Sequence, residues 1–129
     1  MTRTRAEADN TPNALMAEYY AQRASAGLLI AEATAVAADA IAWQNMPGAY
    51  KEEHVAGWKL VTDAVHAKGG TIFLQIWHPG RATHSTLNNG KQPVAPSAVR
   101  LAGDEIHTPL GKLPYETPRA LELDEIKTI

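Results

Sequence analysis

The chain has 129 residues, of which 45% are hydrophobic, so it holds enough apolar material for one domain with its own core. Its 12 basic and 14 acidic residues leave a formal charge of -2, which gives no electrostatic case for binding nucleic acid or an anionic membrane. The absence of cysteine excludes disulfides, thiolate nucleophiles and Cys-ligated metal centres. No apolar run approaches the ~18 residues of a membrane span, and the first residues lack the apolar region of a signal peptide, so we expect a cytoplasmic protein.

The first helix is predicted after a polar N-terminal segment. Residues 1–10 are polar and irregular, and their composition predicts a solvated tail. Thr11 and Pro12 then form a typical helix start, with Thr11 as the N-cap, and apolar residues follow at helical spacing. We predict a helix over residues 12–25 and a short strand over residues 28–34.

The second helix has the strongest pattern. Residues 35–50 show no clear period and contain a Pro-Gly turn signal, which predicts a long loop. A helix over residues 52–68 then opens on two glutamates, which favour a helix N-terminus, and closes on two glycines. Its predicted buried stripe consists of Val55, Trp58, Val61, Thr62 and Val65.

The stretch from Thr71 to Arg81 carries the best candidate site. It begins with an apolar run that is typical of a parallel strand buried on both faces, made by Ile72, Phe73, Leu74 and Ile76. Gln75 interrupts this run, and a buried amide needs hydrogen-bond partners, so we expect a polar group to meet it. Trp77, His78 and Arg81 follow at the carboxyl end of the strand, where parallel α/β folds build their sites.

Two strands that each follow a helix indicate repeated βα units, and therefore a parallel sheet or barrel. The next segment is rich in Pro, Gly, Asn and Ser and is too long for a plain connection. We predict that it forms a lid excursion over about residues 82–117, with a hairpin that pairs residues 97–101 with residues 112–115. Residues 118–126 are expected to lead into another helix, with Ile126 and Ile129 starting its apolar stripe. Because two strands cannot close a parallel sheet, the pattern predicts a partial chain.

Other site chemistries have little support. The five histidines lack the helical spacing and the cysteine partners of zinc sites, so we predict no metal site. Ser85 and Ser97 lack the G-x-S-x-G pattern that exposes a nucleophilic serine. No G-x-G-x-x-G or P-loop occurs, which argues against a Rossmann dinucleotide domain.

Five blocks of the sequence resemble the Old Yellow Enzyme family of FMN-dependent ene-reductases and nitroester reductases. They occur in family order and span almost all of the chain: LMAEYYAQRASAGLLIAEAT, PGAYKEEHVAGWKLVTDAVHAKGG, IFLQIWHPGRATH, PVAPSA and PRALELDEI. The resemblance implies an α/β fold, a partial (β/α)8 TIM barrel, in which residues 1–129 form about the first third. It also implies FMN as the bound cofactor and NAD(P)H as the hydride donor.

The resemblance implies roles for individual residues. Thr2 resembles the family's threonine near the flavin carbonyl, and Ala33 resembles the small residue that ends the second barrel strand against the ring. Gln75 resembles the glutamine that hydrogen-bonds the pyrimidine edge of the flavin, where donors favour the anionic reduced form. Trp77 resembles the tryptophan that lines the substrate pocket. Trp43 stands where bacterial relatives carry a tyrosine, so a larger indole without a hydroxyl should change substrate preference.

Two hypotheses of different class follow. In the first, the chain is a segment of an FMN-dependent oxidoreductase that transfers hydride from NAD(P)H through the flavin to activated alkenes or to nitro or nitrate-ester compounds. The family's catalytic residues lie on later strands, so no catalytic residue is assigned here. In the second, the chain is a catalytically incomplete fragment that self-associates through open apolar faces, or is completed by a second chain. A related branch that reduces dienoyl thioesters with an iron–sulfur centre is a third alternative, and YYAQRAS and the spacing from PVAPSA to PRAL favour the first.

Overall fold

The computed structural model describes all of residues 1–129 and divides them into two compact units. The first unit consists of Met1–Ala35 and Asn45–Trp77, and the second consists of Val36–Gln44 and His78–Ile129. The first unit contains the α-helices and a parallel sheet, whereas short strands and 3-10 turns build the second. Neither α-helix has the length and hydropathy needed to cross a membrane.

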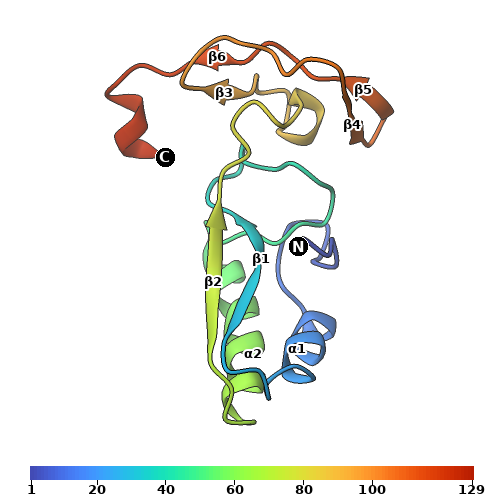
Figure 1. Cartoon of the computed structure of the whole chain (residues 1–129), viewed down its shortest axis with the longest axis vertical. Helices are drawn as coiled ribbons and strands as arrows, with labels where there is room; N and C mark the ends of the chain where they lie inside the picture. Colours follow the sequence, from blue (N-terminus) through green and yellow to red (C-terminus); the bar gives the residue numbers. More distant parts are fainter. The chain divides into compact units, whose positions relative to one another are not determined.

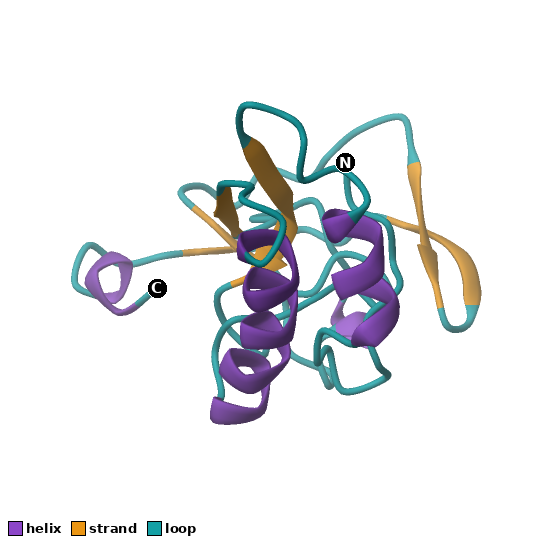
Figure 2. Ribbon diagram, turned by 90° about the horizontal axis from the view of Figure 1, so that it is seen from below, coloured by secondary structure: helices purple, strands orange, loops and turns teal.

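The first unit alternates helices and strands. Its elements are α1 (Ala14–Ala21), β1 (Leu29–Ala35), α2 (Glu52–His66) and β2 (Ile72–Trp77). β1 and β2 pair in parallel, as the sequence predicted. Figure 1 shows α2 running alongside both strands, and Figure 2 shows α1 and α2 side by side. A parallel pair connected through a helix is the repeating unit of α/β barrels.

α1 is shorter than predicted at both ends, and a different residue caps its start. The Asn13 side chain accepts a hydrogen bond from the Met16 N–H at 3.1 Å, so the helix begins at Ala14. Thr11 instead bonds the Asp9 carboxylate through its own N–H and hydroxyl. Asparagine and threonine are both good N-caps, so the sequence pattern could not distinguish Asn13 from Thr11, and the prediction of Thr11 was wrong.

The core of the first unit joins the two helices to β1. Its largest members are Met16, Tyr20, Trp58, Val61 and Val65. Trp58 is buried as predicted, and its Nε1–H donates to the Gly48 carbonyl at 2.9 Å. The prediction that Val55 is buried is wrong, because it is 60% exposed and His54 is fully buried instead. His54 tolerates burial because backbone groups contact both of its ring nitrogens.

β2 is not buried on both faces, which corrects the sequence-based prediction. Ile72 packs against the core, but Phe73 and Ile76 are 62% and 69% exposed, and Gln75 is exposed as well. β1 is the only strand paired with β2. The apolar run correctly predicted a strand, but burial on both faces requires a second covering layer that this chain does not provide.

The N-terminal segment is not a solvated tail, contrary to the prediction. Ala6 is buried, and its N–H donates to the Asn45 carbonyl at 3.0 Å. The Asn10 side chain donates to the Met46 carbonyl at 2.8 Å. Backbone groups in the loop after β1 therefore hold residues 1–10 in place, which composition could not indicate.

The second unit is built from short pairs of strands. β3 (Val94–Ala95) pairs in parallel with β6 (Arg119–Ala120), and β4 (Glu105–Thr108) pairs antiparallel with β5 (Gly111–Pro114). Two 3-10 turns complete it, η1 (Ser85–Leu87) and η2 (Glu125–Thr128). The helix expected to start near Ile126 is present only as the short 3-10 turn η2, and β6 lies in the segment that leads into it.

The predicted hairpin is present, but its first strand was misplaced. Residues 97–101 form no strand, and Glu105–Thr108 takes their place opposite β5. The connection is Pro109-Leu110, followed by Gly111 at a φ of 100°, where glycine is favoured. The alternation of exposed and buried residues along β4 was the signal for this strand. A lid role for the excursion stays a prediction.

A buried polar network stabilises the second unit. The Asn88 side-chain oxygen accepts from the Ile41 N–H at 2.9 Å, and its amide N–H donates to the Thr83 hydroxyl at 2.9 Å. The Thr83 hydroxyl in turn donates to the Ile41 carbonyl. Both side chains are almost fully buried, so the network fixes the 36–44 segment within this unit.

Glu125 should titrate far below an ordinary glutamate. Two hydrogen bonds of 2.8 Å from the Arg119 guanidinium, and a third from the Glu122 N–H, lower the pKa of its carboxyl from 4.5 to about 2. Because the pKa is lower in the folded chain, the ion pair favours folding above pH 4.5, and this contribution is lost as the pH falls toward 2. An NMR titration of the Glu125 carboxyl carbon measures this pKa directly.

Arg119→Met should return the Glu125 pKa toward the ordinary range. Lys112→Met removes one positive charge from the same unit without touching Glu125, and it serves as the control. A midpoint near 4.5 in the unmodified chain would contradict the ion pair.

Candidate functional site

The carboxyl ends of β1 and β2 bring predicted site residues together. Ala33 and Gln75 are register partners, and Ala35 pairs with Trp77 two positions further along the strands. Since side chains alternate along a strand, Gln75 and Trp77 share one face of β2. An amide and an indole therefore follow each other beside two alanines, at the end of the sheet where α/β folds bind ligands.

A bulge in β1 decides which alanine lies beside Gln75. Ile30 pairs with Phe73 and Ala33 pairs with Gln75, so the register shifts by one residue between the two pairs. Ala31 belongs to the core on the helix side. In a regular strand Ala33 would face the same side as Ala31, but the bulge breaks the alternation. The bulge thus turns a small side chain toward the Gln75 face.

The Gln75 amide makes no hydrogen bond within the chain. It is exposed on β2, and its two N–H donors and its carbonyl are available to a ligand. The polar partner that the sequence predicted for Gln75 is therefore not a residue of this chain. A planar group with adjacent N–H and carbonyl functions, such as the pyrimidine edge of a flavin, can hydrogen-bond this amide. The small side chain of Ala33 beside Gln75 leaves room for such a group.

Thr2 is joined to the same strand end by a buried carboxylate. The backbone N–H of Arg3, the residue after Thr2, donates to Glu32 Oε2 at 2.8 Å. Glu32 directly precedes Ala33 in β1. The hydrogen bond therefore holds Thr2 near the part of β1 that carries Ala33, which is the register partner of Gln75.

Glu32 and Tyr20 form the polar centre of this neighbourhood. Glu32 is 2% exposed and Tyr20 is 4% exposed. The Tyr20 hydroxyl donates to Glu32 Oε1 at 3.1 Å and accepts from the Glu32 N–H at 2.8 Å. Burial, and then the nearby Glu32 charge, raise the pKa of Tyr20, while the Glu32 N–H opposes the rise. The sequence reasoning missed this pair, although a carboxylate inside an apolar strand signals a need for partners, as Gln75 did.

Other residues predicted near the strand end lie in the second unit. Trp43 belongs to its 36–44 segment and is 39% exposed. His78 Nδ1 accepts a hydrogen bond from the Gly80 N–H at 3.0 Å. The Arg81 guanidinium donates to the Val99 carbonyl at 3.0 Å. Burial lowers the pKa of His78, which favours its neutral form. The polar groups of His78 and Arg81 thus have structural partners within that unit.

Two alternative chemistries find no support in the geometry. The Ser85 hydroxyl and N–H both donate to the Glu116 carboxylate, at 2.9 and 2.6 Å. The hydroxyl therefore has a structural partner, and no histidine is placed to activate it as a nucleophile. No group of three His, Asp or Glu side chains is arranged to hold a metal ion.

The comparisons with known proteins identify the family. All of residues 1–129 match the NADH:flavin oxidoreductase / NADH oxidase family. The chain belongs to this family. It is 43% identical over 120 residues to a flavin oxidoreductase of Emericella nidulans, matching 92% of this chain and 30% of that protein. It is 42% identical over 131 residues to a probable flavin mononucleotide-dependent alkene reductase of Leishmania infantum, matching 98% of this chain and 36% of that protein.

Solved structures of this flavin oxidoreductase family confirm the fold. The old yellow enzyme homologue of Zymomonas mobilis is 50% identical, with a TM-score of 0.94 over 99% of this chain and 36% of its own. Morphinone reductase is 46% identical with a TM-score of 0.92, and it too is covered over 36% of its length. The chain thus spans about a third of these relatives. The predicted resemblance to Old Yellow Enzyme and the predicted partial TIM barrel are both confirmed.

Proposed function

We propose that this chain supplies one wall of the flavin site in an FMN-dependent, NAD(P)H-driven oxidoreductase of the ene-reductase type. The observation that carries the proposal is the unpartnered Gln75 amide beside Ala33 at the carboxyl ends of two parallel strands. Membership of a flavin oxidoreductase family supports it. A flavin mononucleotide-dependent alkene reductase among the relatives supports the choice of reaction.

In this proposal the residues of the chain bind and orient the ring. When bound, FMN supplies the hydride chemistry. Gln75 donates to and accepts from the pyrimidine edge, Ala33 leaves room for the flat ring to approach, and Thr2 contacts the flavin carbonyl. A donor at the pyrimidine edge stabilises negative charge there, which favours the reduced cofactor.

Trp77 and Trp43 are proposed to contact the substrate. Trp77 follows Gln75 on the same strand face, so a side chain at this position borders whatever lies against the amide. The proposed substrates are activated alkenes or nitro and nitrate-ester compounds. An indole offers one N–H donor and no acceptor, so Trp43 should favour apolar substrates over those that need a hydroxyl partner.

The visible absorption spectrum tests the proposal. The purified chain is mixed with FMN and desalted, and its absorbance is then recorded against a protein-free control. Retained flavin absorbance is expected if residues 1–129 assemble enough of the site, and alkene reduction can then be assayed. A protein that contains this chain together with a complete barrel and still binds no flavin would refute the proposed function.

A self-associating fragment without activity of its own is the second candidate. The specific observation in its favour is the apolar surface of the sheet, where Ile30 and Phe73 on one face and Ile76 on the other are each more than 60% exposed. Sedimentation at several concentrations distinguishes this candidate, because burial of that surface between copies would raise the apparent mass with concentration. A monomer at every concentration would exclude it.

A further inference from the structure

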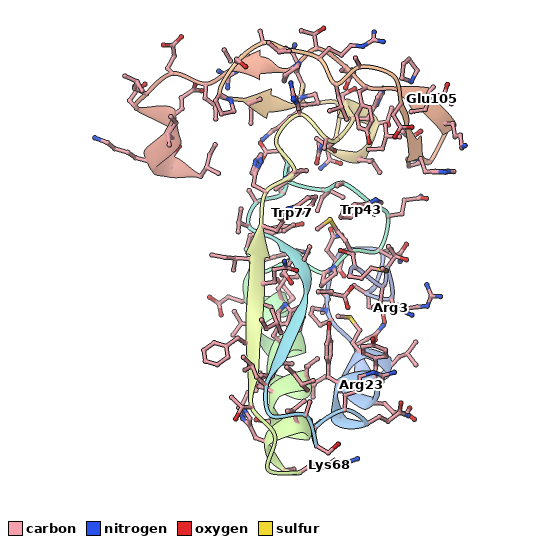
Figure 3. All side chains as sticks on the ribbon, in the orientation of Figure 1. Arg3, Arg23, Trp43, Lys68, Trp77 and Glu105 are labelled. Carbon is pink, nitrogen blue, oxygen red and sulfur yellow. The ribbon has the colours of Figure 1, made fainter.

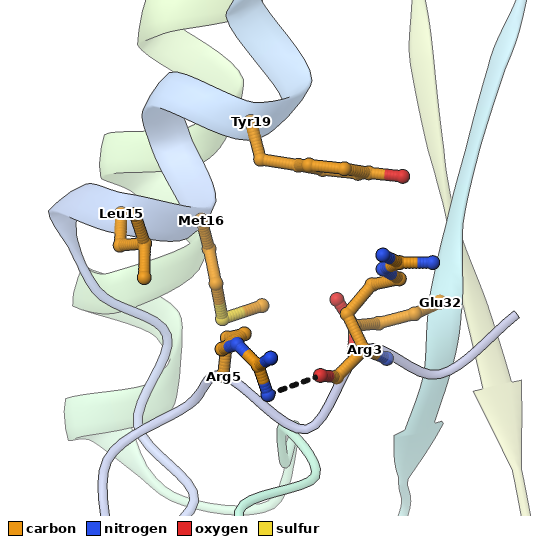
Figure 4. Close-up of a pocket in the computed structure, with 6 residues that line it drawn as sticks. All are labelled: Arg3, Arg5, Leu15, Met16, Tyr19 and Glu32. Carbon is orange, nitrogen blue, oxygen red and sulfur yellow. Dashed lines mark hydrogen bonds between the residues drawn. The ribbon is translucent and has the colours of Figure 1, made fainter.

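A pocket in the first unit, separate from the Gln75 face, has the properties of a ligand site. It has a volume of about 150 Å³ and lies between α1, the N-terminal segment and β1. Figure 4 shows the side chains around it. They are Arg3, Arg5, Leu15, Met16, Tyr19 and Glu32.

One side of the pocket is apolar and matches a six-membered ring in size. Leu15 and Met16, with Tyr19 one turn further along α1, form this side. Met16 is almost fully buried, so its thioether presents a fixed surface to the pocket. An apolar cavity of about 150 Å³ accommodates benzene, and a methionine sulfur favours the edge of an aromatic ring.

The other side carries positive charge with unused hydrogen-bond donors. The Arg3 guanidinium lies 5.5 Å from the centre of the Tyr19 ring and makes no hydrogen bond within the chain. Arg5 uses one terminal nitrogen to bond the Arg3 carbonyl at 3.1 Å. Arg23 stacks on Tyr19 at 3.7 Å and adds a third cation nearby. A guanidinium fork with free donors matches a carboxylate, which it can bind through two parallel hydrogen bonds.

Glu32 offsets only one of these positive charges. Its two carboxylate oxygens accept from Tyr20 and from the Arg3 backbone, at 3.1 and 2.8 Å, and it makes no ion pair with the Arg3 guanidinium. The lining therefore holds two guanidinium groups and one carboxylate, and this balance favours an anion.

We propose that this pocket binds a small aromatic monocarboxylate, with its carboxylate on the Arg3 guanidinium and its ring against Met16 and Tyr19. The pocket shares Glu32 with the network that holds Thr2, but none of its side chains is assigned a flavin contact, so this proposal does not rest on the proposed flavin function. Benzoate is the simplest ligand of this class. Nine heavy atoms in a half-open pocket should bind with a dissociation constant on the order of 1 mM.

Methionine methyl NMR provides the test, because Met1, Met16 and Met46 give separate signals and only Met16 lines the pocket. Titration with benzoate should shift the Met16 methyl signal saturably and leave Met46 unchanged. Benzamide has the same shape without the charge and should bind about tenfold more weakly or not at all. Acetate, which lacks the ring, should bind more weakly as well.

Arg3→Met should weaken benzoate binding about tenfold. It retains the backbone N–H that bonds Glu32, so the fold should persist, and an unchanged Met46 signal verifies this. Lys68→Met is the matched control, since Lys68 is exposed beyond the C-terminal end of α2 and away from Arg3 (Figure 3). The proposal is overturned if benzoate leaves Met16 unmoved, if benzamide binds equally well, if all three methyl signals shift together, or if Arg3→Met binds like the unmodified chain.

Discussion

Glu32→Ala should destabilise the chain by about 3 to 5 kcal/mol, the largest loss expected from any single substitution outside the apolar core. The change removes the acceptor of the Tyr20 hydroxyl and of the Arg3 N–H, at a position that is 2% exposed. Each buried donor left without a partner costs about 1 to 3 kcal/mol. Urea denaturation followed by circular dichroism measures the difference.

Glu32→Gln separates the hydrogen bonds from the charge. A glutamine oxygen can still accept from one donor, but its NH2 group then meets the other donor, so an intermediate loss of about 1 to 2 kcal/mol is expected. Glu105→Gln provides a control, because the Glu105 side chain is exposed and makes no hydrogen bond within the chain. Equal stability of Glu32→Ala and the Glu105 control would show that the network contributes nothing.

The network also explains why an N-terminal segment of unremarkable composition is ordered. Arg3, Ala6 and Asn10 take part in hydrogen bonds with β1 and with the loop that follows it. Those partners lie far along the sequence, and local composition carries no information about them. A buried glutamate in an apolar strand was the one local indication that something polar had to approach β1.

Periodicity predicted the elements of the first unit because each has a strong local signal. The charged opening and apolar stripe of α2, and the apolar run of β2, identified a helix and a strand within a few residues of their observed bounds. Burial was harder to predict. An apolar run indicates that a strand can be buried on both faces. The exposure of Phe73 shows that burial also requires helices or strands from other parts of the sequence to pack on each face.

The candidate site could be predicted only in part, because its geometry depends on register. Gln75 was identified from its own context as a polar residue in an apolar strand. That Ala33 lies beside it follows from the β1 bulge, and no residue type in LIAEATA marks a bulge in advance. The flavin roles of Thr2, Ala33 and Gln75 and the substrate roles of Trp43 and Trp77 rest on the family resemblance and remain predictions.

Gln75→Leu should weaken FMN binding about 10- to 100-fold, while leaving the stability of the chain within about 0.5 kcal/mol. Affinity should change without stability because the Gln75 side chain is exposed and makes no hydrogen bond within the chain. Only hydrogen bonds to a ligand are lost when the amide is removed. Two lost hydrogen bonds of about 0.7 to 1.4 kcal/mol each account for the affinity change. Flavin fluorescence titration gives the affinity, in this chain if it retains FMN and otherwise in the complete protein.

Gln75→Glu tests the electrostatic part of the same role. A carboxylate at this position adds negative charge and removes both donors, so it should disfavour the reduced flavin and lower the two-electron reduction potential by about 30 mV or more, equivalent to about 1.4 kcal/mol. Gln22→Leu, an exposed position on the C-terminal side of α1, should change neither affinity nor potential. If Gln75→Leu binds FMN as tightly as the unmodified protein, Gln75 does not contact the ring, and the Ala33–Gln75 pair is only a feature of the sheet.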